Sequence, residues 1–101
     1  MKIEVLYFEG CPNSTPTLEM VKQVVSELGV DAAITTVEVN DPDQARLHRF
    51  FGSPSVQING IDADPAVRAR TDYAYGCRMY GSTGTPPRQM IEAAIREQVS
   101  S

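Results

Sequence analysis

The residues of this chain most able to do chemistry are its two cysteines, Cys11 and Cys77. Cys11 lies in residues 8–14 (FEGCPNS), after an apolar run and directly before a pattern of helical spacing. The first backbone N–H groups of a helix have no partner within the helix, and the helix dipole places partial positive charge there. Both features stabilise a thiolate, the nucleophilic form of cysteine. We therefore predict that Cys11 is a reactive thiol.

The composition limits the class of protein. The 101 residues, 42% hydrophobic and 22% charged, are typical of one globular domain. A net charge of −4 argues against a sequence-independent binder of nucleic acid, and no apolar stretch is long enough for a membrane span. The N-terminus does not follow a signal-peptide pattern, so we expect a cytoplasmic protein. In that compartment, two cysteines more often react, bind metal or pack in a core than form a permanent disulfide.

Apolar spacing and turn signals predict elements in the order β-α-β-α-β-β-α. Strands are expected over residues 2–8, 33–39 and 55–58 and from Ile61, and helices over residues 13–28, 41–51 and 86–99. The first two strands should be parallel and the last two antiparallel, in a mixed four-stranded sheet flanked by helices. We expect a single α/β domain over residues 1–101, with an insert at about 63–84 before the last helix.

Several short motifs support this order. Gly29 is a suitable C-terminal stop for the first helix, and residues 41–44 (DPDQ) form a strong helix start. Leu47 and the two following phenylalanines should form the apolar side of that second helix, which Gly52 ends. Asn59-Gly60 favours a type I′ hairpin turn between the last two strands.

Three features together resemble the thioredoxin/glutaredoxin superfamily. They are the element order, the Cys11-Pro12 pair at the start of the first helix, and residues 53–58 (SPSVQI) leading into a strand. The resemblance implies a thioredoxin-like fold, a cis Ser53–Pro54 bond lying against the active-site cysteine, and a substrate segment paired with the backbone of Ser53 and Ser55. Pro12 would also contact the substrate.

The redox motif departs from the family's usual Cys-x-x-Cys. Its fourth position is Ser14, as in monothiol glutaredoxins, and Ser14 is expected to donate a hydrogen bond to the Cys11 thiolate. Glutaredoxins usually carry a lysine shortly before the cysteine, but this stretch has Glu9, which opposes thiolate formation and argues against glutathione as substrate. The chain is similar to small bacterial thioredoxin-like proteins, some of which carry an alkylmercury-lyase-like label.

The second cysteine lies in the insert. A connection as long as residues 63–84 is often a lid or a binding loop. Cys77 has two interpretations: it resolves an intermediate formed at Cys11, or it is a small buried hydrophobic residue. Arg78 would favour a thiolate at Cys77. The tyrosines and Met79 of the insert are expected to form a small core of their own, and the acidic residues Asp62, Asp64 and Asp72 to be solvated.

The leading hypothesis is a thiol–disulfide oxidoreductase or thiol carrier without a cofactor. Cys11 attacks a protein or small-molecule disulfide, and Cys77 resolves the mixed disulfide; the residues expected to bind the substrate are Pro12, Ser53, Pro54, Ser55 and Arg78. One alternative is binding of a soft ion such as Hg²⁺, Cu⁺ or an arsenical by Cys11 and Cys77, extending to the handling of organomercurials. The other is a non-enzymatic adaptor whose Tyr- and Arg-rich insert binds a protein.

Overall fold

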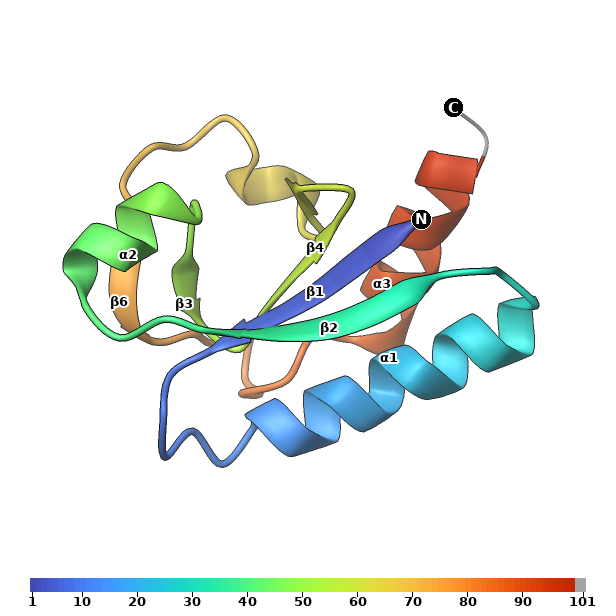
Figure 1. The fold of residues 1–101 in the computed structure, drawn as a ribbon, viewed down its shortest axis with the longest axis horizontal. Helices are drawn as coiled ribbons and strands as arrows, with labels where there is room; N and C mark the ends of the chain where they lie inside the picture. The colour runs from blue at the N-terminus through green and yellow to red at the C-terminus, as the bar shows by residue number, and fades with distance from the viewer. Residues whose placement is uncertain (100–101) are drawn as a thin grey trace.

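A four-stranded mixed sheet in the order β2-β1-β4-β5 forms the centre of the computed structural model, which describes residues 1–99 (Figure 1). The strands are β1 (Lys2–Tyr7), β2 (Ala33–Glu38), β4 (Ser55–Ile58) and β5 (Ile61–Asp62). The helices are α1 (Ser14–Leu28), α2 (Pro42–Leu47) and α3 (Arg88–Val99). β1 runs parallel to β2 and antiparallel to β4, and β4 is antiparallel to β5. This arrangement confirms the predicted mixed sheet and the order of its elements.

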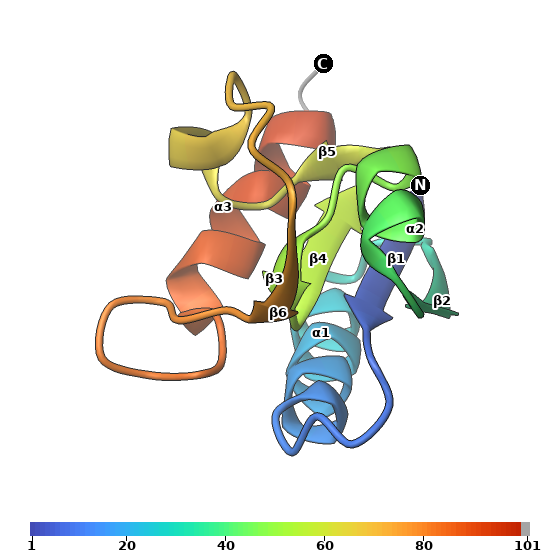
Figure 2. The ribbon, with the colours of Figure 1, turned by 90° about the vertical axis from the view of Figure 1, so that its left-hand side faces the viewer.

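Helices lie on both faces of the sheet, as predicted (Figures 1 and 2). Because side chains alternate along a strand, Val5 of β1 faces α1 and α3, whereas Leu6 faces α2. The larger core joins the sheet to α1 and α3 through fully buried aliphatic residues: Ile3, Val5, Val56, Ile58, Val21, Val24, Ile91 and Ile95. The smaller core lies at α2 and contains Leu6, Val39, Ala45 and Phe50. No helix within residues 1–99 combines the length and apolarity needed to cross a lipid bilayer.

Local signals correctly predicted several boundaries. Gly29 ends α1 with φ 65°, in the left-handed region that suits glycine. Asp41 precedes α2, and its side chain accepts a hydrogen bond of 2.8 Å from the Gln44 N–H. Asn59 and Gly60 have φ angles of 53° and 80°, as a type I′ turn requires.

The second helix is shorter than predicted. It ends at Leu47 rather than at Gly52, and the Leu47 side chain is 77% exposed instead of buried. Arg49 adopts φ 55°, which reverses the chain directly after the helix. The reversal places Phe50 in the smaller core, so of these predicted apolar residues Phe50 is buried as expected whereas Leu47 is not.

The insert contains regular structure that the sequence pattern did not predict. A short 3₁₀ turn, η1 (Pro65–Val67), is followed by β6 (Ala74–Cys77), which pairs in parallel with β3 (Phe51–Ser53) in a second, two-stranded sheet (Figure 2). The expected core within the insert is wrong, because its aromatic rings pack on the rest of the domain instead. Tyr75 packs against Phe8 with ring centroids 5.6 Å apart, and Tyr73 against Phe51 at 5.0 Å.

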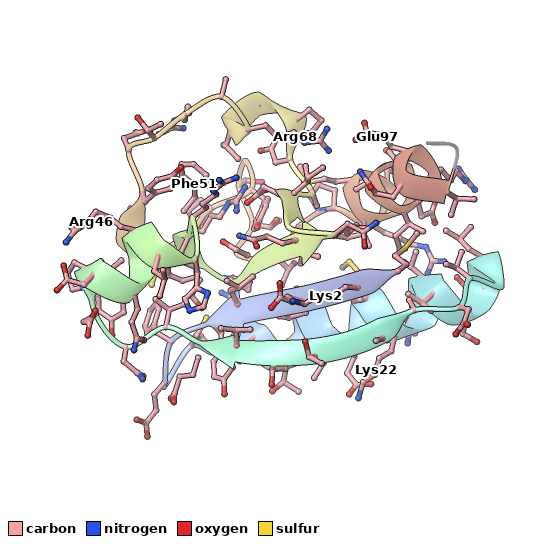
Figure 3. The ribbon with its side chains drawn as sticks, turned by 45° about the horizontal axis from the view of Figure 1, so that its top comes forward. Lys2, Lys22, Arg46, Phe51, Arg68 and Glu97 are labelled. Atoms are coloured by element: carbon pink, nitrogen blue, oxygen red, sulfur yellow. The ribbon has the colours of Figure 1, made fainter. Side chains whose placement is uncertain are left out.

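An ion pair also ties the insert to the last helix. The guanidinium Nη1 of Arg68 lies 2.8 Å from the carboxylate Oε1 of Glu97 in α3 (Figure 3). The insert is therefore held against the domain at two places, next to η1 and at β6.

Candidate functional site

Cys11 lies in the tight turn between β1 and α1. The turn passes through Gly10 at φ 88° and is closed by a hydrogen bond of 3.2 Å from the Cys11 N–H to the Phe8 carbonyl. The helix begins at Ser14, with Asn13 as its N-cap residue. Cys11 thus precedes the first turn of the helix, and only 9% of its surface is exposed. The neighbouring Pro12 is exposed.

Ser14 has a different partner from the one predicted. Its hydroxyl donates a hydrogen bond of 3.0 Å to the carbonyl oxygen of Cys11, rather than to the sulfur. The cause is local, because a serine at the start of a helix can reach the carbonyl three residues earlier. In this arrangement Ser14 orients the Cys11 backbone.

The segment before β4 lies against the start of the Cys11 turn. The Ser53–Pro54 peptide bond is cis, the isomer that the resemblance implied. The Ser53 hydroxyl oxygen accepts a hydrogen bond of 3.4 Å from the Phe8 N–H, at the end of β1. Ser53, Pro54 and Ser55 are all buried. The hydrogen bond thus joins residue 53 to the start of the cysteine turn.

The backbone of Ser53 is already paired within the chain. Its carbonyl accepts a hydrogen bond of 2.9 Å from the Arg78 N–H, and Cys77 lies opposite it in the register of β3 and β6. Sequence reasoning expected this backbone to pair with a substrate segment. In the structure, β6 takes that position.

Arg78, which was expected to bind the substrate, is buried in an ion pair. Its side chain is 7% exposed and forms two hydrogen bonds with the carboxylate of Asp62, at 2.9 and 3.1 Å, and one of 3.0 Å with the Ser55 hydroxyl. Asp62 is 5% exposed, so the prediction that it is solvated is also wrong. Burial lowers the pKa of Arg78, but its hydrogen bonds to the Asp62 carboxylate and the electrostatic effects of Tyr80, Asp62 and Asp64 outweigh burial and raise the pKa overall.

Tyr80, one of the insert tyrosines that were expected to form a separate core, contacts Pro54 instead. Its hydroxyl donates a hydrogen bond of 2.7 Å to the Pro54 carbonyl, and the Arg78 guanidinium carbon lies 4.5 Å from the centre of its ring. Burial raises the pKa of Tyr80, against the opposing effect of the Arg78 charge. No local pattern links a tyrosine in the insert to a proline 26 positions earlier.

The two cysteines have different surroundings. Both are free thiols, and Cys77 is exposed, so its interpretation as a buried hydrophobic residue is wrong. Cys77 lines an open hollow of ≈ 380 Å³ together with Phe51, Asp64 and Met79, and Cys11 does not line this hollow. The fold places Cys77 beside Ser53 without bonding it to Cys11.

The arrangement of side chains gives no specific support for a metal site. Within residues 1–99, no group of three or more His, Cys, Asp or Glu side chains is placed to hold a metal ion. A site made of the two cysteine thiolates alone stays a prediction.

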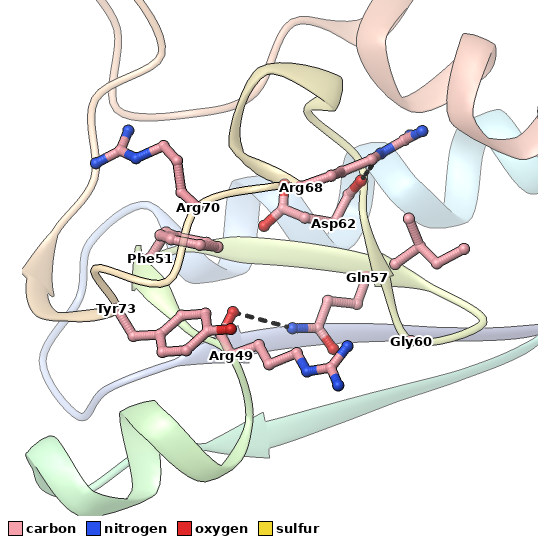
Figure 4. A pocket seen from close by; sticks show the side chains of 9 residues that line it. Arg49, Phe51, Gln57, Gly60, Asp62, Arg68, Arg70 and Tyr73 are labelled. Carbon is pink, nitrogen blue, oxygen red and sulfur yellow. Dashed lines mark hydrogen bonds between the residues drawn. The ribbon is translucent and has the colours of Figure 1, made fainter.

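A second hollow was missed by sequence reasoning. It measures ≈ 230 Å³ and lies between the hairpin of β4 and β5 and the insert, with Arg49, Phe51, Arg68, Arg70 and Tyr73 among its lining residues (Figure 4). Two of these guanidinium groups, those of Arg68 and Arg70, are ion-paired with carboxylates. Neither cysteine nor Pro54 lines it, so it is separate from the Cys11 site.

Comparison with known proteins gives one match. Residues 1–61 match the family model described as a thioredoxin domain. The matched region contains Cys11, Ser14 and Pro54, and it stops before the insert with β6 and Cys77. Neither a curated protein nor a solved structure matches the chain.

Proposed function

Because the chain belongs to the thioredoxin domain family, we propose that it is a thiol–disulfide oxidoreductase or thiol carrier whose nucleophile is Cys11. The position of Cys11 is the observation that supports this most. The thiol sits in a tight turn between a strand and a helix, and the start of that turn is hydrogen-bonded to Ser53. Such turns present the thiol close to a helix N-terminus, where a thiolate is stabilised.

The reaction begins with attack of the Cys11 thiolate on one sulfur of a substrate disulfide. The substrate S–S bond breaks, a mixed disulfide forms at Cys11, and the second substrate sulfur leaves as a thiolate that takes up a proton. Ser14 holds the backbone of Cys11 during this step through its bond to the Cys11 carbonyl. A second thiol then attacks the mixed disulfide and releases the bound half of the substrate.

Cys77 is the candidate for this second thiol within the chain. It is exposed, and it lies opposite Ser53 in the pairing of β3 and β6. Otherwise the second thiol comes from solution, and the protein acts as a monothiol carrier. Two free cysteines suit a reducing compartment, and we include a cytoplasmic location in the proposal.

The test is turnover of a small disulfide, with a dithiol as the source of electrons. Wild-type protein should reduce bis(2-hydroxyethyl) disulfide catalytically in the presence of dithiothreitol, and Cys11→Ser should abolish the catalysed rate. Cys77→Ser tests the resolving role separately, because it should slow turnover only if Cys77 attacks the mixed disulfide. Unchanged turnover in Cys11→Ser would remove the basis of the proposed function.

A further inference from the structure

The insert supplies β6, which pairs with β3 in the two-stranded sheet near Cys11. An extended segment of a protein binds next to a strand by adding its own backbone hydrogen bonds to a free edge. β6 of the insert pairs with one edge of β3, the strand that leads to Pro54. We propose that the substrate of Cys11 is therefore a low-molecular-weight disulfide rather than an extended protein segment. This inference rests on the proposed exchange chemistry at Cys11.

Backbone pairing holds β6 in place along β3. The Ala74 N–H donates to the Phe50 carbonyl at 2.9 Å, and the Arg78 N–H donates to the Ser53 carbonyl at 2.9 Å. A protein segment that paired with this edge of β3 would have to break these two hydrogen bonds as well as the pairing of β3 with β6 itself. Each backbone hydrogen bond contributes about 1 kcal/mol net, so the two named bonds alone slow such pairing by roughly 30-fold, or about 2 kcal/mol at 1.4 kcal/mol per tenfold.

The two strands also leave no space between them. A Cβ atom added at Gly52 would lie 3.0 Å from the Gly76 carbonyl oxygen and 3.0 Å from the Arg78 Cβ. The side chain of Arg78 is itself fixed by its buried ion pair with Asp62. A second backbone does not fit between β3 and β6, so a segment that pairs with β3 on this side has to displace β6.

The end of the insert also contacts residues near Cys11. Tyr80 is hydrogen-bonded to the Pro54 carbonyl, and Gly84 lies so close to the Asn13 side chain that a Cβ atom there would collide with its amide. Asn13 is two residues from Cys11, whose surface is 9% exposed. A thiol with so little exposed surface is reached more easily by a small disulfide than by a folded protein.

The experiment compares two disulfides, bis(2-hydroxyethyl) disulfide and insulin. All proteins carry Cys77→Ser, so Cys11 is the one remaining thiol. In each exchange the Cys11–sulfur bond forms as the substrate S–S bond breaks, the released thiolate takes up a proton, and dithiothreitol regenerates Cys11 while it is oxidised. The readout is the ratio of the insulin rate to the small-disulfide rate.

Gly52→Ala is the variant that separates the strands, and Gly29→Ala is its matched control. Both add a methyl group at a glycine with positive φ, but nothing lies within 4 Å of the added atom at Gly29. Gly52→Ala should raise the ratio about 30-fold, by removal of the two hydrogen bonds described above, and Gly29→Ala should leave it unchanged. If Gly52→Ala does not fold, Ala74→Pro removes the N–H of one of these bonds and should raise the ratio about fivefold.

Two other outcomes would contradict the inference. A ratio that is the same in wild type and in the folded opening variant overturns the inference and leaves the exchange chemistry standing. Loss of exchange with both disulfides in every protein overturns the proposed function, and the inference with it.

Discussion

Replacing Asp62 by asparagine should destabilise the protein, because it leaves the buried guanidinium of Arg78 without its charged partner. The two side chains are 5% and 7% exposed, and the guanidinium makes two hydrogen bonds to the carboxylate. This pair connects β5 to the residue that follows β6. Its loss therefore affects the same contacts that hold the insert beside Pro54.

The structure sets the size of the effect. Breaking a buried ion pair by removing one partner costs about 3–5 kcal/mol. The Asp64 carboxylate, 3.8 Å from Nη2 of Arg78, remains as a weaker partner, so we expect the lower end of this range. A domain of this size has a free energy of unfolding of about 5–15 kcal/mol. A loss of about 3 kcal/mol should lower Tm by about 12–24 °C.

Urea denaturation and thermal melting of Asp62→Asn measure this loss directly. The control is Asp43→Asn, which breaks the ion pair with Arg46 on the surface of α2, where the side chains are 85% and 64% exposed; it should cost less than about 1 kcal/mol. The double variant Asp62→Leu with Arg78→Met removes both charges and should recover much of the stability. If Asp62→Asn costs no more than Asp43→Asn, the pair does not hold the insert and the reasoning is wrong.

Two further predictions concern the end of the insert. Gly84→Ala should reduce the free energy of unfolding by about 1 kcal/mol, because the new Cβ meets the Asn13 amide, whereas Gly76→Ala has open space and should change it little; equal effects in urea melts would contradict the close contact. The buried phenol of Tyr80 has its pKa raised by burial, whereas in the unfolded chain the pKa is about 10. Its contribution to stability is therefore complete below about pH 10 and declines as pH rises toward the folded value, so Tyr80→Phe should weaken the fall in stability between about pH 9 and pH 11. An unchanged pH profile would contradict the burial of this hydroxyl.

Features set by neighbouring residues could be predicted from the sequence. The stop of α1 at Gly29 and the turn at Asn59-Gly60 each depend on backbone conformations that few residue types favour. The start of α2 depends on the bond between the Asp41 side chain and the Gln44 N–H, three residues away. The cysteine turn could be located for the same reason, because a glycine and a helix start flank it.

Features set by distant residues could not be predicted. The pairing of β6 with β3 joins Cys77 to Ser53, and the intervening residues show no clear period. The burial of Asp62 and Arg78 depends on their meeting across this same region, since either charge alone would be expected in solvent. The exposure of Leu47 follows from the left-handed backbone at Arg49, a residue type that does not favour it.

The most direct test of the central claim is to find which cysteine a limiting disulfide modifies first. Reduced protein is mixed with less than one equivalent of 2,2′-dithiodipyridine at neutral pH, quenched with acid and mapped by mass spectrometry of its peptides. Exposure alone favours Cys77, which is exposed, over Cys11, which is 9% exposed. If Cys11 is the nucleophile, the mixed disulfide should form at Cys11 before Cys77, because the position of Cys11 in the turn before α1 then outweighs its lower exposure. Modification of Cys77 first, at a rate that Cys11→Ser does not change, would contradict the assignment of Cys11 as the reactive thiol.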